Sequence, residues 1–129
     1  AGVRNADGDT PILLSCFGGH LNVAKLLSAR GESLGGINEF GCSSLAQACA
    51  GGHLELAQWL LPLAGERLLN LADGEDRTPL QYACEQGYVE LALWLLKRGA
   101  NPTPGAQRAA AESGSKKLIR ALNAGSAKS

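Results

Sequence analysis

Methionine is absent from this chain of 129 residues. Long apolar runs are absent too, since no stretch approaches the roughly 18 to 20 residues that a membrane-spanning helix needs. The first residues also lack the basic-then-apolar order of a secretory signal. These absences predict an intracellular, cytoplasmic protein with no membrane partner. Because no Met stands at the start, the sequence suggests a chain that was processed or cut from a larger protein.

An excess of either charge is also lacking, because twelve Lys and Arg balance twelve Asp and Glu. Such a chain has no overall field to attract nucleic acid or anionic lipid, so we expect neither as a partner. The distribution is uneven, with seven basic and eleven acidic residues in 1–100 (net −4) and five against one in 101–129 (net +4). The body is mildly acidic and the tail is basic.

Motifs for catalysis and cofactor binding are missing. The chain has no G-x-S-x-G, no G-x-x-x-x-G-K-[ST], and no G-x-G-x-x-G that follows a strand. His20 and His53 stand 33 positions apart, and no C-x-x-C or H-x-x-x-H spacing gathers metal ligands. We therefore expect no enzymatic activity, no catalytic residue, no cofactor and no metal.

A repeated segment is what the sequence does contain. The heptapeptide that begins at Gly19 (GHLNVAK) returns at Gly52 (GHLELAQ) 33 positions later, and at Gly87 (GYVELAL) after a further 35. Each copy follows a similar segment, which begins at Thr10 (TPI), Ser43 (SSL) and Thr78 (TPL). A fixed period of roughly 20 to 50 residues is typical of repeat architectures.

Within each copy the pattern predicts a helix, a tight turn, a second helix and a loop. Thr10 and Thr78 are placed as N-caps before a proline that suits the first helical turn. Glycines such as Gly19 and Gly52 end this helix, because glycine accepts the left-handed C-cap conformation. The second helix carries one buried apolar stripe at i, i+3, i+4 spacing. Its predicted members are Val23, Leu26 and Leu27, then Leu56 and Leu60, then Leu91, Trp94 and Leu95. The linking segments, 5–9, 38–42 and 73–77, are rich in Asn, Asp and Gly and predict turns or hairpins.

This sequence pattern resembles that of the ankyrin-repeat family, which runs D-x-x-G-x-T-P-L-H-x-A-A-x-x-G-H and ends L-L-x-x-G-A. The third copy matches best, with Asp73, then TPL from Thr78, Gly87, and GAN from Gly99. The resemblance implies an all-α repeat solenoid of three helix-turn-helix repeats with hairpin tips. The family's His after T-P-L is absent from all three copies.

The predicted boundaries make a single domain over 1–125. Its repeats span about 5–37, 38–72 and 73–102, and a degenerate repeat over 103–122 is interpreted as the C-terminal cap that a solenoid needs. A frayed tail is expected over 123–129. No comparable cap precedes Asn5, so we expect an upstream capping segment to be missing.

The side chains best placed for chemistry have structural explanations. Cys16, Cys49 and Cys84 share one register at spacings of about 10 Å, too far apart for a disulfide, and are predicted to be buried free thiols. Cys42 lies in a turn and is predicted to be exposed and modifiable. Trp59 and Trp94 are expected to pack between repeats. Phe40 stands at a turn tip, where an exposed aromatic would suit a partner, and we expect Phe17 and Tyr82 to join it.

The resemblance also implies a binding surface on the concave side, formed by turn tips and first helices. Carried over by register, its residues include Asp7, Asp9, Phe17, Glu39, Phe40, Cys42, Glu75, Arg77, Glu85 and Gln86. Acidic residues predominate, so a protein or peptide with a basic segment and an apolar anchor is the complementary partner. The chain is expected to be monomeric.

Two interpretations of function remain open from the sequence. In the first, the chain is a protein-binding module that acts by recognition alone. In the second, it is a regulatory or targeting segment cut from a larger enzyme or multidomain protein. Both need the same repeats, so the sequence does not separate them.

Overall fold

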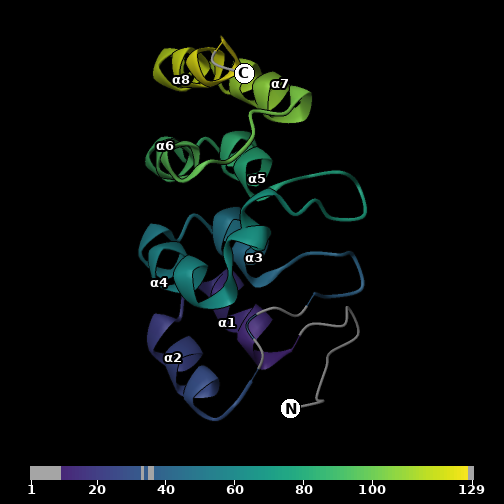
Figure 1. Ribbon diagram of the computed structural model, residues 1–129, viewed down its shortest axis with the longest axis vertical. Coiled ribbons are helices and arrows are strands. Elements are labelled where there is room, and N and C mark those ends of the chain that lie inside the picture. The colour runs from purple at the N-terminus through teal and green to yellow at the C-terminus, as the bar shows by residue number, and fades with distance from the viewer. Residues whose placement is uncertain (1–9, 33, 35–36, 128–129) are drawn as a thin grey trace.

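Helices come in antiparallel pairs that stack into an elongated solenoid (Figure 1). The computed structural model describes residues 10–32, 34 and 37–127, with the backbone alone for 124–127. The pairs are α1 (Pro11–Gly18) with α2 (Leu21–Ala29), α3 (Ser44–Gly51) with α4 (Leu54–Ala64), α5 (Pro79–Gln86) with α6 (Val89–Arg98), and α7 (Pro104–Ser113) with α8 (Lys116–Ala127). A short 3-10 helix, η1 (Glu66–Asn70), follows α4. The all-α repeat solenoid is confirmed.

The first helix of every pair begins and ends where local sequence signals require. The hydroxyls of Thr10, Ser43, Thr78 and Thr103 each accept a hydrogen bond from the amide three residues on, which satisfies one of the free donors at a helix start. At the other end Gly19 takes a left-handed conformation with φ 75°, as do its counterparts. The chain then reverses at once into the second helix, so these caps mark where each repeat turns.

The first helices form a continuous inner column, because α1 packs on α3, α3 on α5, and α5 on α7. Small and medium side chains fill this column, among them the fully buried Leu45, Ala48 and Leu80. The second helices lie along the other side of the stack (Figure 1). The apolar stripe of the second helices, which includes Leu60 and Leu95, packs into the same core.

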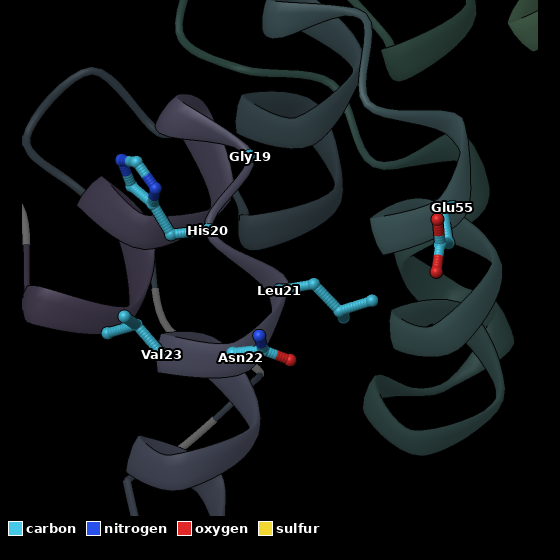
Figure 2. Close-up of a pocket in the computed structure, with 6 residues that line it drawn as sticks. All are labelled: Gly19, His20, Leu21, Asn22, Val23 and Glu55. Carbon is cyan, nitrogen blue, oxygen red and sulfur yellow. The ribbon is translucent and has the colours of Figure 1, made fainter.

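In the first repeat the predicted apolar stripe is wrong for Val23 and Leu26, whereas Leu27 packs against the core as predicted. Val23 is 47% exposed and Leu26 53%, although Leu56 and Leu91, which hold the register of Val23, are each 2% exposed. Figure 2 shows Val23 on the side of α2 that points away from α4. Leu56 belongs to the buried core, whereas Val23 does not.

The longer connection after α4 folds into η1, which the sequence did not predict. Leu68 and Leu69 of η1 are buried in the core. Its last residue, Asn70, accepts a hydrogen bond of 2.7 Å from the amide of Asn101. The extra length of this repeat is therefore used to brace the turn that follows α6.

The C-terminal pair lacks a projecting loop, since α6 ends at Arg98 and α7 begins at Pro104. It packs through Leu118 and Leu122, which are both buried. Charged side chains on its outer faces are exposed, among them Arg108, Lys116, Lys117 and Arg120. The helix α8 runs on to Ala127, past the boundary at 122 that the sequence suggested for this repeat.

Candidate functional site: the finger surface

Two loops project from the inner column to the same side of the molecule (Figure 1). We call them finger 2 (residues 37–43) and finger 3 (residues 73–77). The corresponding segment before α1 contains Asp7 and Asp9, and these two predicted site residues lie outside the described residues.

Finger 2 is built around the Asn38 side chain. Its Oδ1 accepts hydrogen bonds from the amides of Phe40 at 2.9 Å and Cys42 at 3.0 Å, the local pattern by which Asn organises a turn. Gly41 completes the turn with φ 80°, a conformation that glycine adopts without strain. The consequence is that Glu39 and Phe40 stand at the tip, where Phe40 is 57% exposed.

Finger 3 repeats this design with a carboxylate. Asp73 Oδ1 accepts from the amides of Glu75 at 2.8 Å and Arg77 at 3.0 Å. The left-handed position that Gly41 holds in finger 2 is taken here by Asp76, with φ 62°. Glu75 is exposed at the tip.

The two fingers are joined by their backbones. The amide of Gly74 donates a hydrogen bond of 2.8 Å to the carbonyl oxygen of Phe40. A Cβ at position 74 would lie 3.2 Å from that oxygen, which is closer than an ordinary van der Waals contact, so glycine eases this approach. The tip that carries Phe40 is therefore held from within by Asn38 and from outside by finger 3.

A polar cluster lies beneath the fingers and corrects the prediction for Cys42. This residue is buried, and its Sγ lies 3.3 Å from the Tyr82 hydroxyl and 3.8 Å from Asp73 Oδ2. The Tyr82 hydroxyl donates to the same Asp73 oxygen, and Arg77 Nε donates to it at 3.3 Å. Cys42 is thus enclosed between finger 3 and α5 and is not an exposed, modifiable thiol.

The prediction for Tyr82 is also wrong. We expected it to join Phe40 as an exposed aromatic, but it is buried, and the Arg77 guanidinium sits 4.8 Å from its ring centroid. Arg77 itself is half-buried, paired with Asp73 and, at 3.6 Å, with Glu75. The basic residue of the predicted site therefore has its charge engaged within the finger.

The cluster shifts the pKa values of its members. Burial alone would raise the pKa of Asp73, but hydrogen bonds from Tyr82 and from the amides of Arg77 and Glu75 outweigh it and leave the pKa below its usual value. Burial, followed by the hydrogen bond to Asp73, raises the pKa of Tyr82. Burial also raises the pKa of the Cys42 thiol. At neutral pH the cluster therefore holds one carboxylate, one guanidinium, a neutral phenol and a neutral thiol.

The inner helices supply the floor beside the fingers. Phe17, near the end of α1, is 53% exposed as expected. Glu85 and Gln86 are exposed at the end of α5, and Glu85 accepts a hydrogen bond of 3.1 Å from the Gln81 amide group. These residues keep their side chains available to solvent.

His53 links neighbouring repeats. Its Nε2 donates to the carbonyl oxygen of Phe17 at 2.9 Å, which ties the start of α4 to the end of α1. His20 holds the same register in the first repeat, and its side chain is exposed. His53 therefore has a structural role between repeats.

A shallow groove of about 480 Å³ is lined by residues at the starts of α2 and α4 (Figure 2). It is lined by Gly19, His20, Leu21, Asn22, Val23 and Glu55. Leu21 points across it toward α4, whereas His20 and Val23 point to the other side of α2 (Figure 2). The residues that line the groove include no pair of a nucleophile and a general base.

The other cysteines in the described part of the chain have structural roles. Cys16, Cys49 and Cys84 are free and buried, as predicted, and burial raises the pKa of both Cys16 and Cys84 to about 12. Among residues 10–32, 34 and 37–127, no three His, Cys, Asp or Glu side chains group where they could hold a metal ion. No helix in this part has the length and apolar character to cross a membrane.

Sequence reasoning missed the organising residues of the site. Asn38 and Asp73 stand 35 positions apart at the start of equivalent segments, and that shared register was the signal that could have found them. Nothing in the sequence pointed to Tyr82 as the partner of Cys42, because they are 40 positions apart.

Capped helix pairs, an inner column and projecting fingers define a helical-repeat protein with a surface suited to recognition. A family model described as ankyrin repeats, in three copies, matches residues 1–68 and 36–106. The chain belongs to the ankyrin-repeat family, whose members generally act by binding other proteins and are generally not enzymes. A search of curated proteins found no match to the chain.

Proposed function

We propose that the chain binds a partner protein or peptide on its concave side, through fingers 2 and 3 and the exposed ends of α1 and α5. The observation that carries this proposal is Phe40. A large aromatic side chain that is 57% exposed has no role in the core, and its backbone is held at both the amide and the carbonyl. A rigid exposed aromatic binds at low entropic cost, as interface anchors do.

The charge around Phe40 supports a partner with a basic segment. Glu39, Glu75, Asp76 and Glu85 are exposed on fingers 2 and 3 and on α5. The one basic side chain among them, Arg77, is already paired with Asp73 and Glu75. A partner that carries Lys or Arg beside an apolar residue would meet complementary charge and an aromatic contact together.

Phe17 extends the apolar part of this surface. It lies on α1 of the inner column, and its register in the next two repeats is held by Ala50 and Glu85. The floor of the surface therefore changes from aromatic to acidic along the stack. This gradient favours a partner segment that lies along the column with its apolar residue toward α1 and its basic residues toward α5.

The test is an affinity capture from lysate with two matched variants. The concave variant carries Phe40→Ala with Glu39→Lys and Glu75→Lys, and the control variant carries Leu63→Ala with Glu55→Lys and Glu90→Lys on the second helices. All six positions are exposed. We expect partners to be lost from the concave variant and retained by the control variant.

Both variants should show the same circular dichroism and thermal midpoint as the parent chain, which separates lost binding from lost folding. Partners lost equally from both variants, or only from the control variant, would place recognition elsewhere and overturn the proposal.

A further inference from the structure

A basic surface lies on α8, which belongs to the side of the stack away from the fingers (Figure 1). It is formed by the exposed side chains of Lys116, Lys117 and Arg120, and we call it the cap face. Residues 101–129 contain five basic residues and one acidic residue, Glu112. The cap face therefore has the opposite sign to the acidic fingers.

The exposure of the cap face does not follow from its place in the last repeat. In register, Lys117 and Arg120 correspond to Glu55 and Gln58 of α4, a helix with a repeat on either side of it (Figure 1). Both Glu55 and Gln58 are exposed. These two positions therefore face solvent on the outer side of a second helix even where neighbouring repeats are present.

The positive sign of the cap face is not required by the fold. An exposed helix position takes polar residues of either sign, and the first turns of α4 and α6 carry Glu55 and Glu90. Acidic residues there interact favourably with the helix dipole, whereas Lys116 and Lys117 in the first turn of α8 oppose it. The two lysines thus work against the stability of α8, which points to a role in binding.

Most of the charge on the cap face is unpaired. Lys117 Nζ lies 3.7 Å from Glu90 Oε1, and both side chains are exposed. Within the part of the chain that the structure describes, Lys116 and Arg120 form no ion pair. They stand four residues apart, so they project from the same side of α8 about 6 Å apart along its axis. Like charges at this spacing repel each other, and an anionic partner relieves that repulsion.

From these observations we infer that the cap face binds an acidic segment of a partner protein. Carboxylates of the segment pair with Lys116 and Arg120, and the segment follows α8 because Glu90 on α6 repels it. The side chains carry this inference and the helix end does not, since the amide of Leu118 already donates to Ser115 Oγ at 3.3 Å.

Other polyanions fit the cap face less well. A helix that lies on a membrane exposes large apolar residues on one face, and none of the exposed large apolar residues lies in 116–123. Nucleic-acid surfaces combine a strong basic field with aromatic residues for stacking. The whole chain has no net charge, and 101–129 contains no aromatic residue. A short acidic segment needs only the few charges that are present.

This inference does not depend on the proposed function. The cap face lies on a second helix, whereas the fingers project from the column of first helices (Figure 1). The two surfaces have opposite charge, so they select different partners.

The test measures the binding of fluorescent octaglutamate by anisotropy at about 50 mM salt, where exposed charges are only partly screened. The cap variant carries Lys116→Glu and Arg120→Glu. The control variant carries Lys25→Glu and Arg30→Glu at the first repeat, where both residues are exposed. The two variants have the same net charge.

We expect the cap variant to bind octaglutamate at least about tenfold more weakly than the parent chain, because two attractive contacts become repulsive. The control variant should stay within about threefold of the parent chain. The thermal midpoint of the cap variant should equal or exceed that of the parent chain, since Lys116→Glu places an acidic residue in the first turn of α8. Weaker binding would then not result from lost folding.

Equal losses in the two variants would overturn the inference, because overall charge would then attract the peptide. Failure of the parent chain to bind octaglutamate would overturn it as well. Single-stranded octathymidylate and phosphatidylserine vesicles are measured alongside. If either binds the parent chain more tightly than octaglutamate and loses binding to the cap variant, the partner is a nucleic acid or a membrane and not an acidic protein segment.

Discussion

The amide of Gly74 donates a hydrogen bond of 2.8 Å to the carbonyl oxygen of Phe40, across two loops that are separate in sequence. Through this contact finger 3 fixes the backbone at the tip of finger 2. The exposed aromatic side chain is therefore presented by two repeats acting together, and changes in finger 3 should reach it.

Gly41→Ala should destabilise the chain and loosen the tip. Position 41 has φ 80°, and an added Cβ would lie 3.0 Å from the Gly74 nitrogen. A left-handed conformation costs a residue with a Cβ about 1–2 kcal/mol. The control is Gly87→Ala, where φ is 76° and no atom lies within 4 Å. We expect urea unfolding to show a larger loss for Gly41→Ala than for Gly87→Ala, and equal losses would count against contact between the fingers.

Tyr82→Phe should lower the free energy of unfolding by about 1–3 kcal/mol, the usual cost of deleting a hydrogen bond to a buried charged group. The hydroxyl donates to Asp73 and lies 3.3 Å from Cys42 Sγ. Its removal therefore leaves each of these buried groups with one hydrogen-bond partner fewer. Denaturant unfolding at pH 7 measures the change. Tyr88→Phe, in the second-helix register, serves as the control and should stay within about 0.5 kcal/mol.

Asp73 should make stability depend on pH in the acid range. Its pKa in the folded chain lies below the ordinary value of 3.8, so it contributes stability at higher pH that is lost as pH falls below about 4 and through the folded pKa. We expect the urea midpoint of the parent chain to fall between about pH 4 and pH 2.5. Asp73→Asn should show a shallower fall over this interval, and parallel curves would contradict the assignment.

The four native cysteines should resist alkylation. All are buried, and a pKa of about 12 for Cys16 and Cys84 lowers their thiolate fraction at pH 8 roughly a thousandfold relative to a pKa of 9. Mass spectrometry after brief treatment with iodoacetamide should find no label on the native chain and four labels in urea. Rapid single labelling at Cys42 would contradict its burial and support the exposed turn position that the sequence suggested.

His53→Ala and His20→Ala should differ in their effect. The first removes a hydrogen bond of 2.9 Å to the Phe17 carbonyl and should cost about 1 kcal/mol. The second removes an exposed side chain and should change stability by less than about 0.5 kcal/mol. Thermal unfolding of the two single variants measures the difference, and the same loss for both would mean that His53 acts through helix propensity instead.

The repeat and the geometry within each copy follow from local sequence signals alone. A cap residue, a proline and a terminal glycine act over one turn of chain, so the starts and ends of α1 and α5 follow from Thr10, Gly19, Thr78 and Gly87 without knowledge of the neighbours. The exposure of Phe40 was predictable for the same reason, since a turn tip between Glu39 and Gly41 has little around it.

Which side chains become buried between repeats depends on how the repeats pack together. Cys42 lies in a turn, yet Tyr82 and Asp73 from the next repeat cover it. Val23 matches Leu56 in type and register, yet it stays exposed whereas Leu56 is buried in the core. Burial in a stacked array depends on the adjacent unit, and the pattern within one repeat carries no information about where that unit is present or how its loops close.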